Sequence, residues 1–114
     1  MPSPPVSSQI ASDGNLKTVD GVDSATGQDE FNAARDLLHG PNRQLDLRRA
    51  VDLLWASVRK GYVPAEVTLA DLYRRGDGVE KNCDQATVLL TAASKKGSVE
   101  ARRMLEQLAE QGCQ

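Results

Sequence analysis

The sequence predicts an all-α fold, a short α/α helical-repeat solenoid of about five antiparallel helices with a 36-residue period. Three observations support this prediction: apolar residues recur at helical spacing, glycines recur at regular intervals, and two stretches of the chain match when one is shifted by 36 residues. A period of this length with two helices in each unit is typical of stacked helical repeats, in which each unit buries its apolar face against the next.

The chain of 114 residues has room for one small domain. Residues 1–28 contain three of its five prolines, many Ser, Thr and Gly residues, and no aromatic residue. Such a segment buries too little apolar surface to offset the entropy lost on ordering. We therefore predict that residues 1–28 are a disordered lead-in or linker, and that the helical repeat domain spans residues 29–114.

Glycines mark the predicted helix ends, at intervals of 21, 15, 21 and 15 residues. A glycine directly after the last helical residue is a common stop, because that position adopts a left-handed conformation that is costly for other residues. The five glycines are Gly40, Gly61, Gly76, Gly97 and Gly112. Combined with apolar spacings of three and four residues, they predict helices over 29–39, 46–60, 63–75, 82–96 and 98–111.

Polar residues stand where three of these helices begin. Asp46, Asn82 and Ser98 each precede or open an apolar helical pattern, and such side chains accept hydrogen bonds from the first unpaired amides of a helix. Gln85 follows Asn82 at the spacing of a capping box. We expect the three residues to cap the second, fourth and fifth helices.

The internal match divides the domain into two units, 29–64 and 65–100, followed by a capping helix over 98–111. Ten residues recur as the same residue type 36 positions later: Ala50, Leu53, Leu54, Ala56, Lys60, Gly61, Val63, Ala65, Leu69 and Leu72. Small residues at repeated positions indicate close helix crossings. The last helix suits a cap because one of its faces is polar.

The stretch 65–97 resembles a Sel-one-like repeat, a relative of the tetratricopeptide repeat. The matching positions are Ala65, Leu69, Leu72, Tyr73, Gly76, Gly78, Val79, Ala86, Ala92, Ala93 and Gly97. The preceding unit, about 29–61, has Trp55 where the family often has a bulky aromatic residue, but its loop at 40–44 lacks the Gly-x-Gly-Val form. The resemblance implies an α/α solenoid that acts as an interaction scaffold without catalysis.

The two cysteines lie at equal distances from the predicted turn at Gly97 and Ser98. Antiparallel helices that meet at this turn would place Cys83 opposite Cys113, so we predict a disulfide that closes the terminal hairpin. The alternative is two unpaired thiols in a reducing compartment. Because disulfides persist mainly outside the cytoplasm, we expect an extracytoplasmic, periplasmic location if the bridge forms in an anchored or secreted protein, and a cytoplasmic one otherwise.

Composition argues against several functions. The 14 basic and 16 acidic residues are interspersed, which gives no footprint for nucleic acid. No stretch approaches the roughly 20 apolar residues of a membrane span, so we expect no membrane insertion. His39 is the single histidine, and the loop around Gly76 and Gly78 has neither calcium-loop nor phosphate-loop spacing. We therefore expect no catalytic residue, metal or cofactor, and no enzymatic activity.

A binding surface is predicted from repeat geometry. The first helix of each unit commonly lines the concave side of a solenoid, and two rows of outward positions recur at 36 residues, with two arginines beside them. These residues are Glu30, Glu66 and Arg102, then Arg35, Asp71 and Gln107, bordered by Arg74 and Arg103. Their mixed charge indicates a polar peptide or protein partner, although ordinary surface composition explains the same residues equally well.

The function predicted from these features is a non-enzymatic protein–protein interaction module, a repeat scaffold or adaptor, within a larger protein or assembly. The alternative is a structural or regulatory appendage that self-associates by stacking its repeats, with no ligand in a groove. The aromatic residues do not decide between the two, because Phe31, Trp55, Tyr62 and Tyr73 fall at spacings that point toward the core.

Overall fold

The computed structural model describes residues 25–113, so most of the predicted lead-in, 1–28, lies outside the described residues. The described part contains five α-helices and no strand, and the prediction of an all-helical chain is confirmed for it. The helices are α1 (Gln28–Leu38), α2 (Arg43–Arg59), α3 (Val63–Arg75), α4 (Cys83–Lys95) and α5 (Val99–Gln111).

Four helices agree with the predicted ranges to within one residue at each end, but α2 begins three residues early. The prediction that Asp46 caps α2 is therefore wrong: Asn42 is the cap residue, and its backbone carbonyl accepts the N–H of Asp46 at 3.0 Å. The additional turn brings Arg43 within 3.1 Å of Asp77. This ion pair joins residues that are distant in sequence, so local capping preference could not predict it.

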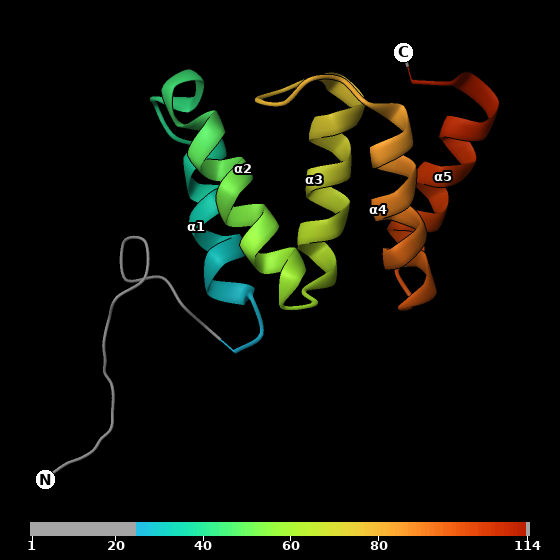
Figure 1. The fold of residues 1–114 in the computed structure, drawn as a ribbon, viewed down its shortest axis with the longest axis horizontal. Helices are drawn as coiled ribbons and strands as arrows, with labels where there is room; N and C mark the ends of the chain where they lie inside the picture. Colours follow the sequence, from blue (N-terminus) through green and yellow to red (C-terminus); the bar gives the residue numbers. More distant parts are fainter. Residues whose placement is uncertain (1–24, 114) are drawn as a thin grey trace, which may run out of the picture.

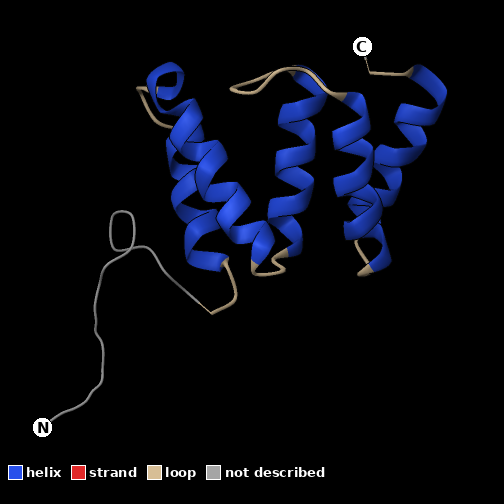
Figure 2. Cartoon of the chain, in the orientation of Figure 1, coloured by secondary structure: helices blue, strands red, loops and turns tan. Residues whose placement is uncertain are grey.

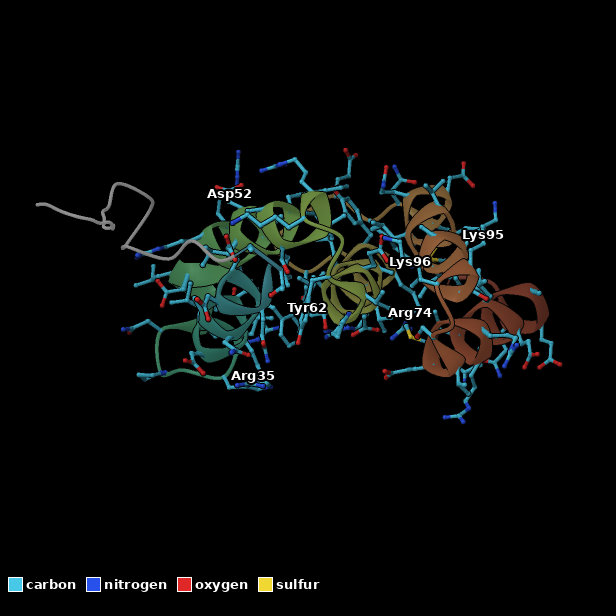
Figure 3. All side chains as sticks on the ribbon, turned by 90° about the horizontal axis from the view of Figure 1, so that it is seen from below. Arg35, Asp52, Tyr62, Arg74, Lys95 and Lys96 are labelled. Atoms are coloured by element: carbon cyan, nitrogen blue, oxygen red, sulfur yellow. A yellow bond between two sulfur atoms is a disulfide. The ribbon has the colours of Figure 1, made fainter. Side chains whose placement is uncertain are left out.

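The helices stand side by side, and each packs against the helix before it and the helix after it in the chain (Figure 1). The connecting turns alternate between the two ends of this array, so neighbouring helices run antiparallel (Figure 2). Seen from below, α1, α3 and α5 form one layer, while α2 and α4 form the other (Figure 3). The array measures 59 × 32 × 18 Å, and its layered arrangement gives it one face built from the odd-numbered helices.

The core consists of leucines separated by alanines. Leu54, Leu69, Leu72 and Leu90 are the largest fully buried side chains. Fully buried alanines lie on every helix, where a small side chain lets helices approach closely. They are Ala34, Ala50, Ala65, Ala70, Ala86, Ala93 and Ala101. The predicted inward leucines and alanines therefore form one continuous core along the array.

The turns on either side of α4 carry the predicted caps. The Asn82 side chain accepts the Gln85 N–H, and the Ser98 hydroxyl oxygen accepts the Ala101 N–H, both at 3.0 Å. Gly97 has φ +99°, so the residue between α4 and α5 is held in the left-handed region that favours glycine. Both caps and the predicted stop at Gly97 are confirmed.

The stop predicted at Gly40 differs from the other four, which all have positive φ. Gly40 lies outside the left-handed region, so the conformation predicted for it is wrong. Its N–H donates instead to the Leu37 carbonyl at 3.3 Å, and the preceding His39 N–H donates to the Arg35 carbonyl at 3.1 Å. The Gly40 bond spans three residues, so α1 finishes in a tighter turn that requires no left-handed residue.

The loop between α3 and α4 folds back over α2 (Figure 1). Gly78 touches α2 closely: a Cβ on it would lie 3.1 Å from the Cβ of Leu47 and 3.4 Å from a methyl group of Val51. With φ +74°, the position combines close approach with a left-handed backbone. This explains why the second glycine of the loop is needed, and it ties the second helix pair to the first.

Replacing Leu54 or Leu90 with Ala tests this core. Both side chains have 0% relative exposure, and truncating a buried leucine costs about 2 to 5 kcal/mol. Leu45→Ala is the matched control, because Leu45 lies on α2 but is 84% exposed. In chemical denaturation we expect a large loss of unfolding free energy for each buried leucine and a change within about 0.5 kcal/mol for Leu45. Equal effects at all three positions would contradict the packing.

Candidate functional site

Two of the residues predicted on the binding surface are buried. Glu30 and Glu66 have relative exposures of 3% and 4%, so their predicted outward placement is wrong. The Glu30 carboxylate accepts a hydrogen bond from the Lys60 ammonium group, and Glu66 Oε2 lies 3.0 Å from Lys96 Nζ. A buried carboxylate requires such a partner, because burial of an unpaired charge is costly.

Each of these ion pairs closes the open end of a helical hairpin. Glu30 and Glu66 lie in the first turns of α1 and α3, while Lys60 and Lys96 are the C-cap residues of α2 and α4. An acid near a helix N-terminus and a base near a C-terminus both interact favourably with the helix dipole. Both members of the first pair recur 36 residues later in the second, and so does the geometry that joins them.

The backbone of the following turn also recurs at this interval. The Tyr62 N–H donates to the Ser57 carbonyl at 3.2 Å, and the Ser98 N–H donates to the Ala93 carbonyl at 3.1 Å. The cap residues Tyr62 and Ser98 have almost the same φ and ψ, at −79° and 109° against −74° and 113°. The two turns therefore share a conformation although their side chains differ.

The other predicted surface residues lie on the odd-numbered helices. Arg35, Arg102, Arg103 and Gln107 are exposed, whereas Asp71 and Arg74 are half-buried. The half-buried residues are engaged with each other, since Asp71 Oδ1 accepts hydrogen bonds from both Nε and Nη2 of Arg74. Figure 3 shows Arg35 on the opposite side of the molecule from Asp52 of α2, on the side of the odd-numbered layer.

A hollow on this face lies between α1 and α3, and we call it the α1–α3 groove. It has a volume of about 320 Å³. Its lining comes from α1 and the residue after it, the first residue of α2, and α3 from Thr68 onward: Phe31, Arg35, Leu38, His39, Arg43, Thr68, Asp71, Leu72 and Arg75. It thus combines an apolar floor with several cationic side chains.

Two carboxylates hold most of the arginines around this groove. Asp77 lies 3.1 Å from Arg43 and 2.7 Å from Arg75, and it therefore links α2 to the end of α3. Asp71 Oδ2 also accepts from Arg75 at 3.0 Å. Arg35 is held differently: its guanidinium carbon stands 5.9 Å from the centre of the Phe31 ring, in a cation–π arrangement.

Sequence reasoning placed Arg35 and Asp71 on this face but did not identify the other groove residues. A signal was present, because Arg35, His39 and Arg43 follow one another at intervals of four residues across the first helix boundary. Arg75 also lines the groove, although it is exposed and is one of two adjacent arginines at the end of α3. Its contact with Asp77 depends on the course of the α3–α4 loop.

A second hollow of about 400 Å³ lies between α2 and the α3–α4 loop. Trp55 and Tyr73 line it, with ring centres 6.2 Å apart in an edge-to-face arrangement. Both rings are partly buried against the core, as the sequence predicts. Its charged lining combines one basic side chain, Arg48, with two acidic ones, Asp52 and Glu80.

Across 25–113 no three His, Cys, Asp or Glu side chains gather as a metal site would require. His39 is exposed and lies at the rim of the groove among arginines. Nor does any helix of the described part have the length and apolar character needed to cross a membrane.

The structure brings Cys83 and Cys113 to disulfide distance, with their Cα atoms 5.7 Å apart. Cys83 opens α4 and Cys113 follows α5, so the bridge joins the open end of the last hairpin, as predicted from their equal distance to the turn. The Sγ atom of Cys113 also lies 3.3 Å from the carbonyl oxygen of Arg74. The pair therefore sits beside the end of α3 as well.

Comparisons of the chain with protein-family models, with curated proteins and with solved structures find no match.

Reducing the Cys83–Cys113 bridge should lower the stability of the protein. The bridge spans 30 residues, and closing a loop of this size stabilises by roughly 3 to 4 kcal/mol in the chain-entropy model. Intact mass and free-thiol counting establish the redox state, and the melting temperature of each form measures the effect. We expect a clear drop on reduction, and none in a Cys83→Ser, Cys113→Ser control treated with the same reductant. Unchanged melting of the wild type would contradict a stabilising bridge.

Proposed function

We propose that this chain is a non-enzymatic protein-binding module built from Sel-one-like helical repeats. In this proposal the two hairpins α1–α2 and α3–α4 are successive units of a short solenoid with a 36-residue period, and α5 is its capping helix. The observation that carries the proposal is the pairing of a buried glutamate with a more exposed lysine, which recurs with both members shifted by 36 residues. An ion pair recurs only if both of its residues recur at the right positions, whereas a single repeated leucine sets no such condition.

The recurring buried alanines support the same interpretation. Ala34 and Ala70 are fully buried at equivalent positions of α1 and α3, and Ala50 and Ala86 are fully buried at equivalent positions of α2 and α4. A match at helix contacts, ion pairs and turns is what two units of one repeat would share. Stacked helical repeats are commonly binding scaffolds, because their successive helices form extended surfaces.

The face of the odd-numbered helices is the proposed binding surface. It carries the α1–α3 groove and the exposed side chains of Arg35, Arg102, Arg103 and Gln107. Crosslinked capture from an extract of the cells that make the protein tests it, with the full chain as bait. Arg35→Glu changes the proposed face, whereas Asp52→Lys reverses a charge on the opposite side and is the matched control.

We expect the wild type and Asp52→Lys to capture the same set of proteins. The captured amount should fall at least about tenfold with Arg35→Glu, because charge reversal in an interface is strongly unfavourable. Circular dichroism checks that all three baits are equally helical. Equal capture by the three baits, or loss with Asp52→Lys alone, would contradict the proposed surface.

The rival function is self-association by repeat stacking without a groove ligand. It makes a different prediction, because the molecular mass of a self-associating protein in solution rises with its concentration. Light scattering across about a hundredfold range of concentration separates the two. A constant monomeric mass supports the binding module, while a dimer or longer stack that survives Arg35→Glu favours the rival.

A further inference from the structure

The floor of the α1–α3 groove offers an apolar surface to a ligand. Leu72 is buried beneath it with 1% relative exposure, and Phe31 and Leu38 are only partly buried. The Phe31 ring is fixed from behind by Tyr62, with ring centres 5.3 Å apart. A hollow of about 320 Å³ is at the lower end of small-molecule pockets, and its size suits a few side chains of an extended peptide.

The rim of the groove has an excess of positive charge. Arg35, Arg43 and Arg75 line it together with a single carboxylate, Asp71. Asp77 lies behind the rim and bridges Arg43 and Arg75, which orders their guanidinium groups on that side of the groove. Among the described residues, Arg35 makes no ion pair and is steadied only by the Phe31 ring. Its planar donors are available for a carboxylate.

Three groove residues of the first unit have no counterpart of the same type in the second unit. Shifting by 36 residues replaces Arg35 with Asp71, Phe31 with Val67 and Arg43 with Val79, whereas buried positions such as Glu30 keep their residue type. The arginines and the aromatic ring of the groove therefore do not recur, whereas Leu72 of its floor recurs as Leu108. Phe31 packs on Tyr62, and Arg43 and Arg75 pair with Asp77, but among the described residues Arg35 makes no ion pair that would explain its place.

We infer that the α1–α3 groove binds an acidic peptide segment of a partner protein. A large apolar side chain of the peptide lies on Phe31, Leu38 and Leu72, and carboxylates on either side of it pair with Arg35 and with the Arg43–Arg75 rim. The charge complementarity of the rim selects this occupant over a neutral or basic one. The inference rests on the proposed protein-binding function and specifies the ligand class of the same face.

The probe is a fluorescein-labelled pool of twelve-residue peptides with four Glu or Asp residues around one central Leu, Phe or Trp. Fluorescence polarisation with the full chain measures binding. We expect saturable binding that weakens at least about fivefold when the salt concentration rises from about 0.05 to about 0.3 M, because screening acts on exposed charge pairs. A pool with Gln and Asn in place of the acids, and one with Ala at the centre, should each bind at least about tenfold more weakly.

Two protein variants locate the site. Arg35→Glu should weaken binding of the acidic pool at least about tenfold. Lys95→Glu makes the same change of charge at an exposed residue of α4 and should alter this binding less than about twofold. Absence of binding by the acidic pool, equal binding by the neutral pool, or equal loss in both variants would overturn the inference. If partner capture still depends on Arg35 in that case, the protein-binding function stands and only the acidic ligand class fails.

Other occupants of the groove give distinguishable results. The chain itself contains an acidic stretch with Asp13, Asp20 and Asp23. If replacing these three residues with Asn in the full chain strengthens binding of the pool more than about tenfold, an intramolecular occupant replaces the proposed partner. A mass increase in light scattering that Arg35→Glu abolishes would assign the groove to a second copy. Either result overturns the inference, and we expect neither.

Discussion

The carboxylate–ammonium pair at the open end of each hairpin is the interaction on which the arrangement of the helices depends. A glutamate in the first turn of one helix is buried against the lysine that ends the next helix. Because a buried carboxylate without its partner is costly, the pair penalises any sliding of one helix along the other. Its contribution lies in fixing the register more than in net stability, since a well-packed apolar pair could stabilise as much. The leucine and alanine core then fits in that single register.

The remaining contacts extend this register along the array. The α3–α4 loop rests on α2 through Gly78, and Asp77 in the same loop holds Arg43 at the start of α2. These contacts link the first hairpin to the second. The Cys83–Cys113 pair closes the open end of the last hairpin, α4–α5. The odd-numbered helices are thereby held beside one another, and the groove between α1 and α3 is a consequence of their fixed spacing.

Local signals in the sequence predicted the parts of the fold that depend on neighbouring residues. Asn82 and Ser98 cap their helices because a cap needs only the next three residues, and equal distance from a turn was enough to place Cys83 opposite Cys113. Asp46 does not cap α2, because α2 begins at Arg43, where the side chain pairs with the distant Asp77.

Glu30 and Glu66 occupy positions 36 residues apart, as predicted, but the ordinary preference of charged residues for the surface predicts exposure for both. Their burial depends on the lysines that lie 30 residues further along the chain. Preferences that concern only neighbouring residues do not predict this pairing.

Double-mutant cycles at both ion pairs test this account most directly. Glu30 and Lys60, and separately Glu66 and Lys96, are each replaced by Met, singly and together, and unfolding free energies are measured by denaturant titration. We predict that each single change is destabilising, that each double change costs less than the sum of its singles, and that both pairs couple by about 1 to 3 kcal/mol. Additive effects at both pairs, or coupling at one pair only, would contradict the claim that the pairing of a buried glutamate with a lysine, present in both hairpins, sets the register of the helices.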